Sequence, residues 1–372
     1  MEATANPGAI VAWCGFALGL VFGAVGNKVS FCTMGAVSDI VNMGDWGRMR
    51  MWLLAIAVAI LGSYALWHAG LIDLSKSIYT SPNFTWLSFI TGGLLFGVGM
   101  TLGSGCGSKT LIRIGGGNLK SLVVYVFLGI AAYMTLRGLF GQLRVSVLQP
   151  VAINFEAHGL KGQDLPSLLA GTGIAIATLR VAIAALVASA LLIFVMKDRE
   201  FRANGQYVVG GVVVGLIVVA GWYVTAHLGY RENPATLEMT FFGTNTRAAE
   251  SFSFVAPLAY TLELLMLWTD KSLTITFGIM AALGVVIGSF AYAVASRTFR
   301  WEGFTTIEDL ANHIVGGILM GFGGITALGC TIGQGISGLS TLALGSILTF
   351  AAIIAGSAAT MKYQYWKIMR ES

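Results

Sequence analysis

The sequence predicts an all-α polytopic membrane protein, and two observations support this fold class. Of the 372 residues, 56% are hydrophobic and only 10% are charged, whereas soluble domains carry about 25% charged residues. A chain of this length with so little charge lacks the polar shell that a globule in water needs. The second observation is a series of apolar stretches of about 18 residues or more, the length that crosses a ~30 Å hydrocarbon core.

Nine apolar stretches are predicted to be transmembrane helices. About four shorter pieces lie between them, at 31–42, 106–115, 251–268 and 330–338. These are too short or too glycine-rich to cross the bilayer, and we expect re-entrant or interfacial helices whose backbone is satisfied by surrounding protein. The nine predicted spans are 8–26, 49–71, 86–104, 118–138, 168–196, 206–228, 272–296, 309–329 and 342–361.

The distribution of basic residues predicts the orientation. With the N-terminus outside, fourteen of the 22 Lys and Arg residues fall in inside loops and seven in outside loops, while Arg180 lies within a span. Basic residues favour the inside, so the C-terminus is expected there. The first basic residue, Lys28, follows the first apolar run, so no cleavable signal peptide is predicted and this span stays in the mature protein.

Two segments resemble each other within the chain. Residues 92–106 (GGLLFGVGMTLGSGC) and 316–330 (GGILMGFGGITALGC) share seven of fifteen positions, including the final cysteine. The predicted topology gives them opposite orientations, as an inverted repeat requires. We therefore expect a 4+1+4 layout: a first repeat of four spans (1–138), an external loop with a joining span (139–205), and a second, inverted repeat of four spans (206–372).

Three of the four cysteines share one sequence context. Cys32, Cys106 and Cys330 each precede a short segment, and in an inverted repeat such segments direct their N-termini towards a midplane site. Helix N-termini receive anions, and thiols are weak donors, so the three are predicted to line the path of a soft, sulfur-containing anion. The alternative is that each is a small buried hydrophobe, which is the interpretation we assign to Cys14.

Other residues near these cysteines are candidate supporting groups. Gly105 and Gly329 precede the second and third of them, and Thr331 and Gln334 follow the third. The Gln334 amide is a candidate donor to a bound anion. Lys109 either attracts an anion or reflects the basic bias of inside loops. For Arg180, within the joining span, pairing with a carboxylate is the favoured interpretation because an isolated charge there is costly.

Several function classes are excluded by what the sequence lacks. It has no Ser/His/Asp set, no H-E-x-x-H and no phosphate-binding loop, and its Gly115-Gly116-Gly117 stretch lacks the following Lys-Ser/Thr. No C-x-x-C pair suggests a metal site, and no basic stripe suggests nucleic-acid binding. We expect no enzyme activity, no cofactor and no metal.

The motifs FCTMGAVSDI (31–40), GSGCGSKTLIRIGGGNLKSLVV (103–124) and GCTIGQGISGLS (329–340) resemble the YeeE/YedE family of bacterial inner-membrane sulfur transporters. The resemblance implies thiosulfate uptake by an hourglass-like protein in the inner membrane, whose N-terminus the basic residues place in the periplasm. It also implies that Cys32, Cys106 and Cys330 relay the anion through a narrow waist. A cytoplasmic sulfur-carrier protein is a candidate partner at the inner mouth.

Two alternatives stay open at this point. One is transport of another sulfur or selenium species, because the family includes proteins linked to such compounds. The other is a membrane-embedded sulfur-transfer or redox protein in which one cysteine carries a persulfide, which requires an accessible thiolate.

Overall fold

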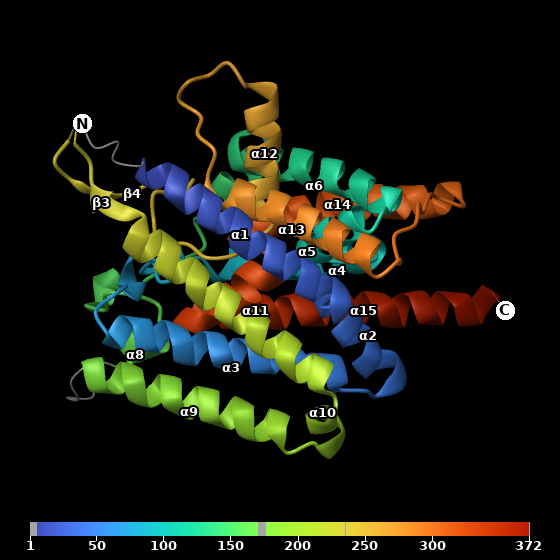
Figure 1. Ribbon diagram of the computed structural model, residues 1–372, viewed down its shortest axis with the longest axis horizontal. Helices are drawn as coiled ribbons and strands as arrows, with labels where there is room; N and C mark the ends of the chain where they lie inside the picture. The colour runs from blue at the N-terminus through green and yellow to red at the C-terminus, as the bar shows by residue number, and fades with distance from the viewer. Residues whose placement is uncertain (1–5, 170–175, 235, 372) are drawn as a thin grey trace.

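Long helices running side by side form the molecule, a computed structural model that describes residues 6–169, 176–234 and 236–371 (Figure 1). The two labelled chain ends lie at opposite ends of the bundle. Within the described residues the long helices are α1 (Pro7–Lys28), α3 (Gly47–His68), α4 (Trp86–Leu102), α6 (Leu119–Arg137), α9 (Ile176–Met196), α11 (Gly205–Tyr223), α13 (Phe277–Ala295), α14 (Ile307–Thr326) and α15 (Leu344–Glu371).

Eight helical segments of the described chain are long and apolar enough to cross a membrane. The multi-pass membrane fold is therefore confirmed. The predicted span 309–329 corresponds to α14, which is 20 residues long but falls outside those eight because Glu308, Asp309 and His313 make its first turns polar. Part of the predicted span 168–196 lies outside the described residues, and its helix is described from Ile176.

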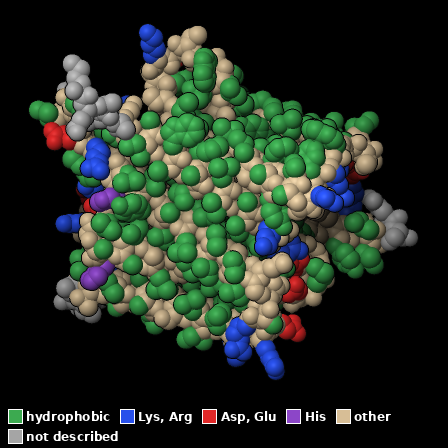
Figure 2. Space-filling model, viewed as in Figure 1, with side chains coloured by type: hydrophobic (Ala, Val, Ile, Leu, Met, Phe, Trp, Pro, Cys, Tyr) green, Lys and Arg blue, Asp and Glu red, His purple; other side chains and the backbone are tan. Residues whose placement is uncertain are grey.

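The surface shows the consequence of the apolar sequence. In the view of Figure 2, green hydrophobic side chains cover the middle of the molecule, while most Lys, Arg, Asp and Glu side chains gather towards its left and right ends. These ends are also the ends of the long helices (Figure 1). An apolar band between two charged ends is the surface that a bilayer covers.

Short helices occur where the sequence predicts short pieces. They are α2 (Thr33–Met43), α5 (Gly107–Gly115), α12 (Ala256–Met266) and the π-helix η6 (Gly333–Gly338). The other short helical elements are connectors or helix ends: η1 (Leu74–Lys76), α7 (Leu139–Leu143), η2 (Arg144–Leu148), η3 (Glu156–His158), α8 (Leu165–Leu168), α10 (Arg199–Ala203), η5 (Val224–Leu228) and η7 (Leu339–Thr341).

In the described ranges, four very short strands interrupt the all-helical pattern. β1 (Asn83–Phe84) pairs antiparallel with β2 (Ile153–Asn154), and β3 (Tyr230–Glu232) pairs antiparallel with β4 (Met239–Phe241). With two or three residues each they leave the all-α class unchanged. They give structure to the loops between the long helices, which the hydropathy pattern alone does not predict.

Glycine allows the long helices to approach closely. α1 packs along α13, α3 along α11, and α14 along both α4 and α6. At Gly23 on α1, an added Cβ would lie 2.1 Å from the Val285 carbonyl oxygen of α13. No side chain fits at that distance, so these glycines set the helix separation.

We expect Gly23→Ala to destabilise the fold, because the new methyl group forces α1 away from α13. Overpacking of this kind costs roughly 1–3 kcal/mol. The matched control is Gly205→Ala, since a Cβ at Gly205 meets nothing within 4 Å. Thermal unfolding of the two variants in detergent checks this, and equal melting temperatures would contradict the packing role of Gly23.

The buried cation of the joining helix is paired, as the sequence analysis favours. Arg180 on α9 lies 3.9 Å from the Asp164 carboxylate, and its guanidinium lies over the Trp67 ring at 5.2 Å. Its side chain is only 16% exposed. A charge inside an apolar bundle needs such a partner, so Arg180 fastens the 161–168 segment to α9 and α3.

Candidate anion site at three helix junctions

Three junctions between a long and a short helix share one backbone geometry. Each long helix ends in a residue with positive φ that lies two positions before a cysteine. The residue between this one and the cysteine donates its amide hydrogen to the carbonyl of the residue five positions before it. This Schellman-type closure ends the helix, and the short helix starts directly after the cysteine. The positive-φ residues are Ser30 (φ 49°), Ser104 (57°) and Leu328 (60°), and the closing bonds are Phe31 N to Gly26 O (3.0 Å), Gly105 N to Met100 O (2.8 Å) and Gly329 N to Gly324 O (2.7 Å).

The short-helix backbone donates hydrogen bonds to the thiols, and the Lys109 amide is the donor to Cys106. The Cys32 Sγ accepts from the Gly35 amide at 3.4 Å. The Cys330 Sγ accepts from the Gly333 amide at 3.4 Å and from the Phe254 amide at 3.3 Å. Backbone donors at a helix N-terminus suit a negative ligand. These amides and sulfurs therefore form a polar region inside an apolar bundle.

Cys106 contacts residues of the other two junctions. Its side chain interacts with the Cys32 thiol and the Thr331 hydroxyl, and it lies within electrostatic range of Cys330. Its Sγ is 3.3 Å from the Ser108 Oγ. We call Cys32, Cys106 and Cys330 the cysteine cluster; all three are buried free thiols.

Two neighbours complete the surroundings of the cluster. Thr331 is fully buried, and its hydroxyl interacts with the Cys106 side chain. Lys109, on the first turn of α5, interacts electrostatically with both Cys32 and Cys106. Gly105 makes room for it, because a Cβ there would lie 3.1 Å from the Lys109 Cγ. A cation and a hydroxyl therefore lie beside the same thiols.

The Gln334 amide donates to a backbone carbonyl, whereas the sequence predicts that it donates to a bound anion. Its Nε2 donates to the Ala327 carbonyl at the end of α14, and its Oε1 is buried with no partner in the described chain. Gly329 accommodates the side chain, since a Cβ there would lie 3.2 Å from the Gln334 Cγ. In this structure Gln334 holds the junction around Cys330, and donation to an anion stays a prediction.

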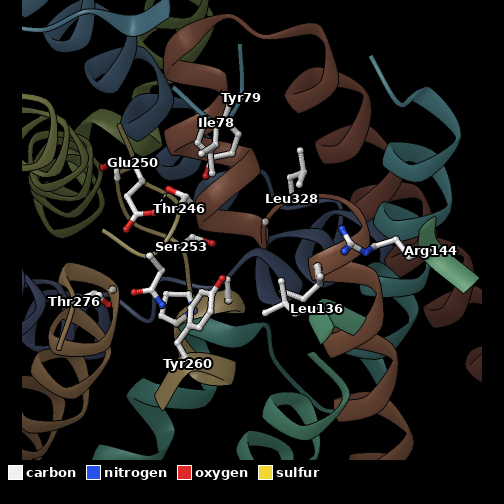
Figure 3. A pocket seen from close by; sticks show the side chains of 18 residues that line it. Ile78, Tyr79, Leu136, Arg144, Thr246, Glu250, Ser253, Tyr260, Thr276 and Leu328 are labelled. Atoms are coloured by element: carbon white, nitrogen blue, oxygen red, sulfur yellow. Dashed lines mark hydrogen bonds between the residues drawn. The ribbon is translucent and has the colours of Figure 1, made fainter. Parts of the chain in front are cut away.

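A cavity of about 120 Å³ reaches Gly329, next to Cys330. We call it the Glu250 cavity (Figure 3); Glu250, Thr246 and Ser253 lie on one side of it and Arg144 on the other. The buried Tyr79 hydroxyl has no hydrogen-bond partner among the described residues. It lies 3.2 Å from where a Gly333 Cβ would be, so this hydroxyl stands between the cavity and the Cys330 junction.

Burial shifts the pKa of four side chains in this cavity: Tyr79, Arg144, Glu250 and Tyr260. Burial raises the pKa of Glu250 to about 7, although hydrogen bonds from the Thr246 hydroxyl (3.0 Å) and the Asn245 backbone oppose the shift. Burial also raises the pKa of Tyr79 well above its usual value. Tyr79 is therefore a neutral donor near pH 7, while Glu250 changes charge close to neutrality.

A second, wider cavity of about 440 Å³ adjoins the first, since Asn245, Tyr260 and Thr276 line both. Its lining carries charges of both signs, from Arg137, Arg247, Glu263 and Asp270, and Arg137 lies 3.7 Å from the Glu263 carboxylate. The positive and negative charges of this lining therefore balance.

A third cavity, of about 670 Å³, lies at the other end of α13. We call it the Lys109 cavity; Arg113, Arg297 and Arg300 line it with Lys109. The Glu250 cavity is lined by the first turn of α13 and the Lys109 cavity by its last turn and the residues beyond it. A 19-residue helix is about 28 Å long, and the cysteine cluster lies between the two cavities.

Comparison with known proteins identifies the family of the chain. A family model described as "Sulphur transport" matches residues 28–359. The chain belongs to this sulphur transport family. It is therefore a membrane transporter, and the family resemblance inferred from the three cysteine motifs is confirmed.

Two relatives make the likeness more specific. The chain is 27% identical over 332 residues to the thiosulfate transporter TsuA of Escherichia coli (strain K12), with 87% of this chain and 86% of the relative covered. It is 26% identical over 352 residues to the thiosulfate transporter TsuA of Spirochaeta thermophila, with 93% and 96% covered. The sulphur transport family member described here thus matches both relatives over most of their length.

Sequence reasoning missed the loop residues of the site. Tyr79, Glu250 and Ser253 lie in connections between helices and carry no motif. Glu250 lies directly before the short piece 251–268. A single acidic residue beside an apolar segment is the signal by which the sequence could have identified it as a site residue. Nothing in the sequence places it near Cys330.

Proposed function

We propose that this family member takes up thiosulfate through the cysteine cluster. The observation that supports this most is the meeting of three thiols, from three separate helix junctions, between two cavities at opposite ends of the bundle. Both relatives named above are thiosulfate transporters. Polarizable thiols with few full charges suit a soft dianion that must be held and released.

The proposed orientation is N-terminus outside and C-terminus inside, in a bacterial inner membrane. The two-to-one excess of basic residues in inside loops supports it. With this orientation the Glu250 cavity faces the periplasm and the Lys109 cavity faces the cytoplasm. Thiosulfate then passes Cys330 first and Cys106 and Cys32 afterwards.

We infer that the chain is an hourglass-like inverted repeat with its waist at the cysteine cluster, comprising 1–138, the connection 139–205, and 206–372. Corresponding contacts support it: α1 packs on α13 as α11 packs on α3, and α6 packs on α14 as α15 packs on α4. Such pairs are expected where two halves are related by a two-fold axis in the membrane.

The dianion is held by many weak contacts in this proposal. Burying a bare charge is prohibitive, so its water must be replaced by donors. Thiols of the cluster, the Thr331 hydroxyl and backbone amides at the short helices provide them, and Lys109 offers charge on the inner side. A cytoplasmic sulfur-carrier protein is the proposed recipient at the basic Lys109 cavity.

Growth tests the function. A bacterium that lacks its own thiosulfate uptake, given thiosulfate as its only sulfur source, is expected to grow when it expresses this chain. It should grow slowly or not at all with Cys330→Ala, and normally with Cys14→Ala, because Cys14 lies within α1 away from the junctions. No growth difference between wild type and empty vector would contradict thiosulfate uptake.

A further inference from the structure

Glu250 is an acidic group in a cavity that the proposed function assigns to an anion. It lines the same space as Gly329 and Tyr79, which adjoin Cys330. Its carboxylate accepts a hydrogen bond from the Thr246 hydroxyl at 3.0 Å. Among the described residues it forms no ion pair. An ionised carboxylate here would repel an entering dianion, since like charges in a confined, poorly solvated space interact strongly.

We propose that the Glu250 cavity binds the substrate anion together with one proton, which the Glu250 carboxylate holds. This inference rests on the proposed function and adds to it a proton-linked loading site. The carboxylate takes the proton from the outside medium as the anion enters. When the anion moves on towards Cys330, the carboxyl group returns the proton to the same side.

Among the titratable groups described in this cavity, Glu250 is the one that changes charge near neutral pH. The facing titratable and charged groups are Tyr79 before α4, Tyr260 of α12, Arg144 of η2 and Cys330 at the α14 junction. Figure 3 shows Arg144 across the cavity from Glu250. Tyr79 stays neutral, and arginine stays charged in proteins. Loading at neutral pH therefore depends on the carboxyl group of Glu250.

The protonated cavity also has the donors that an anion needs. The buried Tyr79 hydroxyl has no partner in the part of the chain that the structure describes, and the Ser253 hydroxyl lies 2.7 Å from where a Gly333 Cβ would be. A neutral Glu250 carboxyl adds an O–H donor on the same side of the cavity as Ser253 (Figure 3). Protonation thus converts a repelling group into a binding group in one step.

The test measures thiosulfate uptake into liposomes that contain the purified full chain. The outside pH is varied from 6 to 8.5 with the inside pH matched, so no proton gradient contributes to the rate. Thiosulfate stays a dianion across this range. For the wild type we expect the apparent KM to rise by up to about 10-fold per pH unit above pH ~7, as linkage to one proton requires.

Glu250→Gln mimics the protonated form, so its KM is expected to stay low and independent of pH. Thr246→Val removes the hydroxyl that stabilises the ionised carboxylate, so the midpoint should move to higher pH. This second variant keeps the acid and tests the idea even if Glu250→Gln folds poorly. Glu232→Gln, at an exposed position of β3, is the control and should behave as wild type.

The outcomes separate the two proposals. If the wild type transports thiosulfate and Glu250→Gln retains the wild-type pH dependence, the proton site is wrong while the proposed function stands. An unchanged midpoint in Thr246→Val would equally count against it. If the wild type moves no thiosulfate at any pH, the proposed function itself fails.

Discussion

Replacing Cys106 by alanine is expected to reduce thiosulfate uptake by about 10- to 100-fold in cells that depend on this chain. Cys106 is the member of the cluster that interacts with both Cys32 and Thr331 and lies within range of Cys330. A hydrogen bond to a charged group contributes roughly 1.5–3 kcal/mol, which corresponds to this loss. Initial rates with labelled thiosulfate measure it.

Two further variants show whether the thiol itself matters. Cys106→Ser keeps a donor of similar size but loses the polarizable sulfur, so its uptake is expected to lie between wild type and Cys106→Ala. Cys14→Ala, on α1, is the control for loss of a cysteine. Full uptake by both Cys106 variants at equal protein levels would remove Cys106 from the transport path. A stable sulfur adduct on one cysteine would favour the sulfur-transfer alternative.

Removing the charge of Lys109 is the second change with a large expected effect. A unit charge about 5 Å from a bound charge contributes about 3 kcal/mol at an effective dielectric constant of ~20. Lys109→Gln is therefore expected to raise the apparent KM for thiosulfate about 100-fold. The reason is its position beside Cys32 and Cys106, where the proposed path leads from the cluster to the Lys109 cavity.

Controls separate this local charge from the basic character of the inner side. Lys197→Gln removes an exposed charge predicted to lie on the same side, and it should leave KM unchanged. Lys109→Arg keeps the charge and should recover much of the affinity. If Lys197→Gln and Lys109→Gln have equal, small effects, then Lys109 only follows the positive-inside bias that the sequence analysis set beside the anion role.

Much of the helical scaffold was predictable because apolar length and helix type are linked in a membrane. The short pieces were predictable as well, since 31–42 and 106–115 match α2 and α5 closely. The predicted span 309–329 was harder to recognise, because Glu308 and Asp309 lie in the first turn of α14 and lower its apolar character. Residues of a polar first turn near the membrane surface are compatible with a helix that packs against α4 and α6.

The candidate site was predictable only in part. Cys32, Cys106 and Cys330 were predictable because each follows a glycine-rich helix end and precedes a short segment. This pattern is local and can be recognised in the sequence. Tyr79 and Glu250 lie in loops, and only tertiary folding brings them to the Cys330 junction. For Gln334, the residue type suggested an anion donor, while its contact with Ala327 depends on how α14 ends.

The central claim is that this chain alone moves thiosulfate through the cysteine cluster. The most direct measurement is uptake of labelled thiosulfate into liposomes that contain only the purified protein, with unlabelled sulfate, sulfite and selenium analogues as competitors. We predict saturable uptake that sulfate does not suppress, and none above background for the combined Cys32→Ala, Cys106→Ala and Cys330→Ala variant. Equal uptake by that folded variant and by wild type would contradict the account.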